Sequence, residues 1–216
     1  MNLADPVSKK INRRRALTLG MCFLAISTLG IYGCKDTSGN ASSGISEELK
    51  QRIEPLLVGD LAAMAVRESA EDLSELKFNG ADGNTITMAD TGGKFRLVNL
   101  WATWCAPCRA EMPALDELQR QRGGDKFEVI AISVDGGGQE KPRAFFDEIR
   151  LKDLTFYHDP TIGVFNDLKR KSLALGLPVT LLLDDNNRVV ANMNGPADWA
   201  SEDALRLVDA VIAEQN

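Results

Sequence analysis

Cys105 and Cys108, three positions apart, are the residues of this sequence whose type and spacing most directly suggest chemistry. Such a pair can ligate a metal ion, form a disulfide that supports the fold, or exchange electrons with the disulfide of a partner. The pair lies between the apolar run KFRLVNLW at 94–101 and a stretch with helical periodicity. The three possibilities differ in the ligands, the loop length and the position along the chain that they require.

A metal site is disfavoured because the pair has few companions. Structural zinc takes four ligands, and a single Cys-x-x-Cys supplies two. The only histidine is His158, and the other cysteines, Cys22 and Cys34, lie in or beside an apolar N-terminal segment. Copper(I) fits better, because exported thiol pairs can bind it, although the accompanying His or Met ligands are missing. Copper(I) handling by Cys105 and Cys108 therefore stays as an alternative function.

A purely structural disulfide gains little here, because loop-closure stabilisation grows with loop length and this loop is very short. The position of the pair favours redox chemistry instead. Cys105 falls where a buried strand ends and a helix begins, so unpaired backbone N–H groups and the helix dipole favour its thiolate. Cys108 lies one turn further in and is less exposed. Cys105 is predicted to attack a partner's disulfide, and Cys108 to resolve the mixed disulfide.

The elements that must position this pair can be read from periodicity. Alternating residues at 74–78 and 84–88 predict a hairpin, and nearly continuous apolar runs at 94–101 and 126–134 predict strands buried on both faces. Helices are expected at 46–57, 107–122, 141–150, 161–173 and 201–214, and further strands at 154–158, 179–185 and 189–194. Parallel strands joined by a helix, followed by an antiparallel pair and a last helix, predict a small α/β sandwich.

The first 34 residues are predicted to direct the chain to a membrane. KKINRRR precedes the uncharged stretch at 16–33, which as a helix would span roughly 27 Å, close to a bilayer core. Preceding basic residues direct the remainder outward. The length favours an uncleaved signal anchor, but IYGC also resembles a lipobox that would lipidate Cys34, and a cleaved signal peptide stays open. All three place the rest of the chain outside the cytoplasm, and the family resemblance described below implies the periplasmic side of the bacterial inner membrane.

The rest of the chain is acidic. Of the 25 Lys and Arg residues six precede residue 36, but of the 31 Asp and Glu residues only one does. Residues 36–216 therefore carry a formal charge of −11. Nucleic acid is therefore not expected as a partner. KDTSGNASSG begins a flexible linker at 35–45. Ser46 is a candidate N-cap that opens a helical extension at 46–72.

The motif WATWCAPCRAEMP resembles the active site of thioredoxin-fold oxidoreductases, and more narrowly that of the membrane-tethered TlpA/ResA/DsbE family. GLPVT at 176–180 matches the Gly-x-Pro-x-Thr that follows this motif, and FEVIAISVD, EKPRAFF and GPADWASEDALRL extend the resemblance over 73–214, with the TlpA branch most similar. The resemblance implies a thioredoxin fold at 73–216, with a central mixed sheet flanked by helices, an N-terminal β-hairpin extension and an inserted α-β unit.

The same resemblance implies a substrate-binding surface beside the disulfide. Pro178 corresponds to the cis-proline of the fold, and Leu177 and Pro178 would offer backbone to an extended segment of the partner. Trp104, directly before Cys105, is expected on this docking surface. Trp101 is expected in the core, and Arg109 is a candidate for steering partners.

Two polar residues refine the expected mechanism. Asn99 stands six residues before Cys105, where thioredoxins usually have an Asp that relays protons. Glu111, three residues after Cys108, matches a glutamate of the ResA-like active site and shares a helix face with Cys108. A nearby carboxylate disfavours a second negative charge. Glu111 is therefore our candidate for the proton acceptor of Cys108, with a carboxylate that merely stabilises the helix N-terminus as the alternative.

One departure from the TlpA branch concerns the N-terminal helix. That branch carries a second cysteine pair between its N-terminal region and its late hairpin, but neither the stretch around Ser46 nor DDNNRVV at 184–190 has a cysteine. The N-terminal helix is therefore expected to be held by packing alone.

The sequence thus predicts a membrane-tethered, extracytoplasmic thiol–disulfide oxidoreductase that acts mainly as a reductant. A monomer without a cofactor is expected. A membrane thiol carrier would supply its electrons, and its substrates would be cysteine-containing apo-proteins. The TlpA branch implies the copper site of haem-copper oxidases, and the ResA/DsbE branch implies c-type cytochromes. The direction of transfer cannot be derived from CAPC, because such pairs differ widely in potential.

Overall fold

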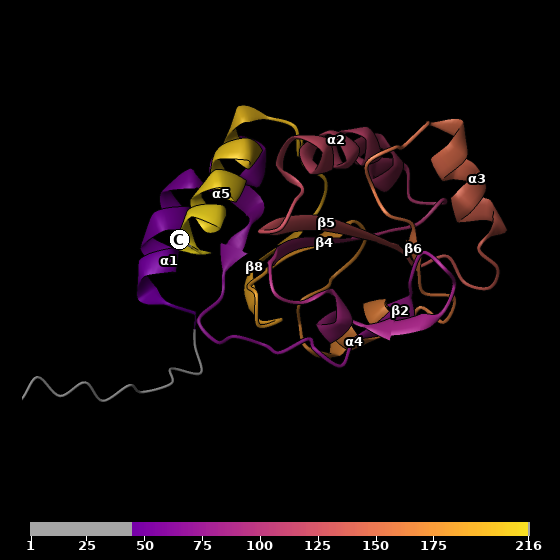
Figure 1. Cartoon of the computed structure of the whole chain (residues 1–216), viewed down its shortest axis with the longest axis horizontal. Helices are drawn as coiled ribbons and strands as arrows, with labels where there is room; N and C mark the ends of the chain where they lie inside the picture. The colour runs from indigo at the N-terminus through magenta and orange to yellow at the C-terminus, as the bar shows by residue number, and fades with distance from the viewer. Residues whose placement is uncertain (1–44, 216) are drawn as a thin grey trace, which may run out of the picture. The chain divides into compact units, whose positions relative to one another are not determined.

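The computed structural model describes residues 45–215 (Figure 1). The predicted anchor or signal segment at 1–34, with Cys34, and nearly all of the predicted linker lie outside the described residues. Within 45–215, none of the helices combines the length and apolar character that crossing a bilayer requires.

The core of the fold is a mixed sheet whose eight strands follow the order β1-β8-β7-β4-β5-β6-β2-β3. The strands are Ala65–Val66 (β1), Lys77–Asn79 (β2), Thr85–Thr87 (β3), Phe95–Trp101 (β4), Phe127–Ser133 (β5), Tyr157–His158 (β6), Val179–Leu183 (β7) and Val189–Asn194 (β8). β4 pairs parallel with β5 and antiparallel with β7. All seven residues of β4 are buried, which explains why its sequence is apolar except at Arg96 and Asn99.

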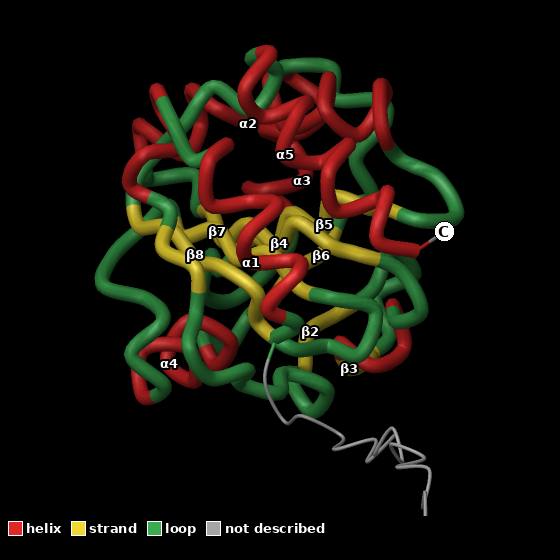
Figure 2. The backbone as a smooth tube through the Cα atoms, turned by 90° about the vertical axis from the view of Figure 1, so that its left-hand side faces the viewer, coloured by secondary structure: helices red, strands yellow, loops and turns green. Residues whose placement is uncertain are grey.

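Helices cover both faces of this sheet. The α-helices are Glu47–Ile53 (α1), Ala106–Arg122 (α2), Glu140–Glu148 (α3), Gly163–Arg170 (α4) and Glu202–Ile212 (α5). Figures 1 and 2 show α2 and α5 on one side of the central strands and α4 on the other. α2 turns Cys108, Met112, Leu115 and Leu118 into the core. The predicted thioredoxin-like arrangement of a mixed sheet flanked by helices is confirmed.

The predicted hairpin and the predicted inserted unit extend the sheet together. β2 and β3 pair antiparallel, as SELKF and NTITM indicate, and Asn79 of β2 pairs with His158 of β6. β6 is shorter than the strand expected at 154–158. The backbone N–H groups of Lys152, Asp153 and Leu154 donate to the Asp116 carboxylate, which ties the segment before β6 to α2.

The N-terminal extension is attached by more than side-chain packing. Ser46 caps α1 as expected, because its hydroxyl accepts the N–H of Leu49. α1 lies beside α5, and Arg52 forms an ion pair with Glu214 at 2.9 Å. The segment expected to be helical at 46–72 also contains β1, which pairs with β8. The pairing of β1 holds the chain that follows the helix. The helix itself contacts α5 without a disulfide, as expected, and the Arg52–Glu214 ion pair adds to this packing.

Candidate active site

The disulfide lies at the junction between the central strand β4 and helix α2. β4 ends at Trp101, and α2 begins at Ala106 with Cys105 as its N-cap. The N–H of Cys108 donates to the Cys105 sulfur over 3.3 Å. Pro107 occupies the first turn, where the missing N–H removes no helix bond. The unpaired N–H groups and the positive end of the helix dipole therefore act on Cys105, as predicted.

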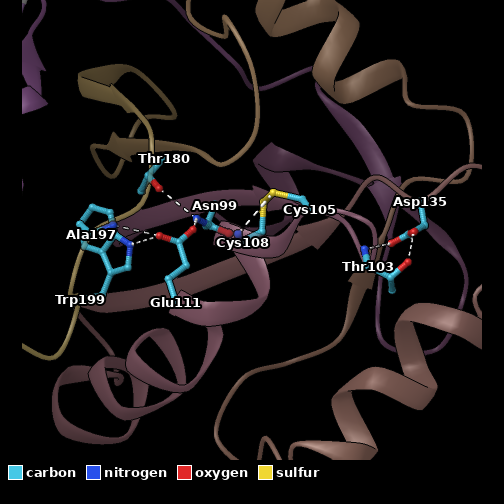
Figure 3. The surroundings of a disulfide bond; sticks show 9 residues. All are labelled: Asn99, Thr103, Cys105, Cys108, Glu111, Asp135, Thr180, Ala197 and Trp199. Atoms are coloured by element: carbon cyan, nitrogen blue, oxygen red, sulfur yellow. Dashed lines mark hydrogen bonds between the residues drawn. A yellow bond between two sulfur atoms is a disulfide. The ribbon is translucent and has the colours of Figure 1, made fainter.

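Cys105 and Cys108 form a disulfide, with their Cα atoms 5.3 Å apart (Figure 3). Cys108 is fully buried, and Cys105 retains 5% of its surface. The expected order of exposure is confirmed, although the difference is small in this oxidised state. Trp104 beside them is 70% exposed, which suits a docking surface for a partner.

The loop before β7 reaches the same edge of the sheet. Val179 at the start of β7 pairs with Leu100 near the end of β4, so the preceding residues adjoin the start of α2. The bond between Leu177 and Pro178 is cis, as the resemblance implied. Leu177 is half-buried and Pro178 is buried. Their part in substrate binding, like that of Trp104, stays a prediction.

Glu111 lies buried beneath the disulfide, one helical turn beyond Cys108. One carboxylate oxygen accepts the side-chain amide of Asn99 at 2.8 Å. The other accepts the indole N–H of Trp199 at 3.1 Å and the backbone N–H of Ala197 at 3.2 Å. Burial raises the pKa of Glu111 above its usual value, and these three hydrogen bonds oppose the rise. The carboxyl group can therefore take up or release a proton without a charged partner.

Asn99 connects this carboxylate with the late part of the sheet. Its amide nitrogen also donates to the Thr180 hydroxyl at 3.0 Å, while its buried carbonyl oxygen has no hydrogen-bond partner among the described residues. Sequence reasoning identified Asn99 and Glu111 but did not assign Thr180, Ala197 or Trp199 to the site. GPADWAS carried only a resemblance, and no spacing rule connects Trp199 to a helix 88 residues earlier.

A second carboxylate fixes the loop that enters the cysteine pair. Thr103 donates both its N–H and its hydroxyl to Asp135, over 2.9 and 2.6 Å. Asp135 also accepts the Ser133 hydroxyl, and a ring nitrogen of His158 contacts the Asp135 carbonyl oxygen at 2.8 Å. Sequence reasoning missed this cluster, because its members come from three separate elements. It holds the backbone two residues before Cys105.

Trp101 and Arg109, two other residues considered in the sequence, contact aromatic side chains of α3. Trp101 is fully buried and stacks on Phe146, which confirms its core position. Arg109 is exposed, and its guanidinium lies 5.1 Å from the centre of the Phe145 ring. Steering of partners by Arg109 stays a prediction. Within residues 45–215, Cys105 and Cys108 have no group of His, Cys, Asp or Glu around them that could complete a metal site.

The parallel strands, the helix that starts at a Cys-x-x-Cys disulfide and the cis-proline at the same sheet edge define the thioredoxin-like class. Within it, Glu111 lies buried beneath the disulfide, at the position that the resemblance to the TlpA/ResA/DsbE family implied. The Redoxin family model matches residues 65–208, more than half of the chain, and the chain belongs to this family.

Individual proteins are also similar to part of this chain. The thioredoxin-like protein YneN of Bacillus subtilis is 31% identical over 120 residues, 55% of this chain and 66% of that protein. The thiol-disulfide oxidoreductase ResA of Oceanobacillus iheyensis is 34% identical over 117 residues, 53% of this chain and 56% of that protein. The chain thus matches between half and two thirds of their length. A DsbF homologue from Corynebacterium diphtheriae shares the fold, with a TM-score of 0.56 at 24% identity, over 68% of this chain and 92% of that one.

Proposed function

We propose that this protein is a membrane-tethered, extracytoplasmic reductant of cysteine pairs in apo-proteins. The observation that carries the proposal is the Cys105–Cys108 disulfide at the start of α2, above a buried carboxylate that forms no ion pair within residues 45–215. A disulfide that only supported the fold would gain little from so short a loop and would not need a proton acceptor.

In the proposed reaction, the thiolate of Cys105 attacks one sulfur of the partner's disulfide. A bond forms between Cys105 and that sulfur, and the second sulfur of the partner leaves as a thiolate. Cys108 then loses its proton and attacks Cys105, which closes the protein's disulfide and releases the first sulfur. Two electrons pass to the partner. We assign the proton of Cys108 to Glu111, whose pKa is raised by burial.

The tether and the cellular role rest on the sequence. The uncharged segment at 16–33 after a basic stretch supports export, with anchoring as such or through a lipid on Cys34. A thiol carrier in the membrane would then return electrons to Cys105 and Cys108. The resemblance to the TlpA/ResA/DsbE family supports substrates in respiratory cytochrome assembly, either the copper site of haem-copper oxidases or c-type cytochromes.

The reduction potential of the Cys105–Cys108 pair tests the proposed direction. Equilibration of the full chain with a dithiothreitol redox buffer should give a value near the roughly −270 mV of thioredoxin. A value near the roughly −120 mV of DsbA would reverse the assignment from reductant to oxidant. Cys108→Ser should then trap substrates as mixed disulfides on Cys105, and Cys105→Ser is the matched control that traps none.

The copper(I) alternative makes a different prediction for the same pair. The reduced protein would bind one copper(I) tightly through two thiolates and would not reduce the disulfides of insulin. Insulin reduction together with weak copper(I) binding would favour the oxidoreductase. The outcome separates the two functions, because each needs both cysteines but only one needs electron transfer.

A further inference from the structure

The carbonyl oxygen of Asn99 is one of four buried side-chain atoms within 45–215 that lack a hydrogen-bond partner. Asn99 is fully buried on β4, so this oxygen is not exposed to bulk solvent. An unsatisfied buried acceptor destabilises the fold, and such a group in a native protein needs an explanation. The same carboxamide uses its nitrogen twice, toward Glu111 and toward Thr180.

The position of Asn99 indicates which donor its carbonyl oxygen can accept from. In Figure 3 the carboxamide lies between the Glu111 carboxylate and the disulfide. Cys108 and Glu111 are three residues apart on α2 and are both buried, so their side chains lie on the same face of this helix. Asn99 on β4 lies against this face, because its amide nitrogen donates to Glu111. Because the nitrogen is directed at Glu111 and Thr180, the oxygen is free for a donor on the other side of the carboxamide.

We propose that the Asn99 carboxamide couples the protonation of Glu111 to that of Cys108 by turning over. This inference rests on the proposed function, because it concerns the step in which Cys108 resolves the mixed disulfide. Asn99 exchanges no proton and no electron itself. It is a positioning residue that presents an acceptor or a donor to the sulfur, according to the charge of Glu111.

Both states satisfy the polar groups. With Glu111 ionised, the amide nitrogen donates to it, as observed, and the amide oxygen accepts the S–H of Cys108 in the reduced protein. With Glu111 protonated, the turned amide accepts the carboxylic O–H and donates an N–H to the Cys108 thiolate. The Thr180 hydroxyl fits either state, because a hydroxyl can accept from the nitrogen or donate to the oxygen.

The coupling acts on the step in which Cys108 resolves the mixed disulfide. The proton of Cys108 is taken up at Glu111, and an electron pair of the Cys108 sulfur forms the bond to Cys105. The bond between Cys105 and the partner's sulfur breaks, and that sulfur leaves as a thiolate. Glu111 lines an open groove of about 330 Å³ with Pro107, Ala110, Ala114 and Pro196, through which its proton can return to solvent.

The test follows the reaction of the reduced protein with 5,5′-dithiobis(2-nitrobenzoate) by stopped flow. Attack by Cys105 releases one 5-thio-2-nitrobenzoate, and resolution by Cys108 releases a second at a rate independent of reagent concentration. Asn99→Leu should slow the second phase about tenfold at pH 7, the effect of one lost hydrogen bond to a charged group. It should also move the pH at which this phase is half-maximal upward.

Asn192→Leu is the matched control. Asn192 is also a buried asparagine whose nitrogen donates, to the Leu173 carbonyl, and whose oxygen lacks a partner. Its loss should leave the second phase unchanged. If folded Asn99→Leu resolves the mixed disulfide with the rate and pH profile of the wild type, the inference is overturned and the proposed function stands. Release of one equivalent by the wild type would instead overturn the proposed function.

A measurement without any variant covers the case in which Asn99→Leu does not fold. In the reduced wild type, the side-chain ¹⁵N resonance of Asn99 should shift with pH in step with both Glu111 and Cys108. In the oxidised protein, where Cys108 carries no proton, it should follow Glu111 alone. A resonance that does not respond to reduction would contradict the coupling.

Discussion

A buried ionisable side chain lies near each end of β4, and one of the two stabilises the fold while the other lies beside the disulfide. Near its start, Arg96 is 0% exposed, and near its end Glu111 of α2 lies against Asn99. The guanidinium donates to neutral oxygens of five residues: Met88, Thr91, Lys94, Asp184 and Asn187. The carboxylate accepts from three neutral N–H groups. Both charges are thus stabilised by dipoles rather than by a bonded opposite charge.

The chemical difference lies in what each group can do with a proton. Burial lowers the pKa of Arg96 and the nearby Asp184 and Glu128 carboxylates oppose that change, but a guanidinium still keeps its proton. Burial raises the pKa of Glu111 above its usual value, and a carboxyl group, unlike a guanidinium, can bind and release a proton. Arg96 therefore links the turn between β7 and β8 to the segment before β4 by hydrogen bonds, whereas Glu111 can exchange a proton beside the disulfide.

The largest expected effect is the loss of stability in Arg96→Met. The substitution leaves the Lys94 carbonyl and the Asn187 side-chain oxygen without their donor, while the Met88 and Asp184 carbonyls each keep another one. The free energy of unfolding should therefore fall by about 2–6 kcal/mol, at about 1–3 kcal/mol for each buried acceptor left unpaired. Urea denaturation of the oxidised protein measures it. Arg109→Met, which removes an exposed guanidinium, should change stability by less than about 1 kcal/mol. Equal losses in both variants would show that the Arg96 network contributes nothing specific.

The second prediction concerns a donor to Glu111. Trp199→Phe keeps the ring in the core but removes the indole N–H, so the free energy of unfolding should fall by about 1.5–3 kcal/mol at neutral pH. The pKa of Glu111 should rise further, because the charged form loses a hydrogen bond. Carboxyl ¹³C shifts measure this pKa. Trp101→Phe is the control for indole loss alone, since the Trp101 N–H has no partner within residues 45–215. An unchanged Glu111 pKa in Trp199→Phe would exclude Trp199 as a donor that stabilises the Glu111 carboxylate.

These residues show how far the sequence predicts the molecule. The apolar run of β4, the Cys-x-x-Cys position and the helical periodicity of α2 are local patterns, and each predicted the right element. Pro178 as cis came from the resemblance alone. Arg96 and Trp199 gave no signal, because their partners are distant in the chain and a buried polar residue has no periodicity of its own. The sequence therefore predicts the sulfurs of the site better than the groups that control their protons.

The third prediction follows the pH dependence of stability. Because the pKa of Glu111 is raised in the folded state, the unfolded chain releases this proton first as the pH rises from about 4.5. The folded protein should therefore lose stability with rising pH, by at most about 1.4 kcal/mol per unit, until the folded pKa is passed. Glu111→Gln should lack this slope. Parallel curves for the wild type and Glu111→Gln, measured with urea at several pH values, would show that Glu111 titrates normally.

The smallest effect belongs to the loop that enters the disulfide. Thr103→Val removes the hydroxyl that donates to Asp135 and keeps the backbone N–H bond, so the free energy of unfolding should fall by about 1 kcal/mol. The attack of Cys105 on a small disulfide reagent should slow only slightly, since the helix N-terminus that favours the thiolate is unchanged. Thr103→Ser keeps the hydroxyl and should retain most of the stability. If Thr103→Ser loses as much as Thr103→Val, the methyl group rather than the hydrogen bond to Asp135 holds this loop.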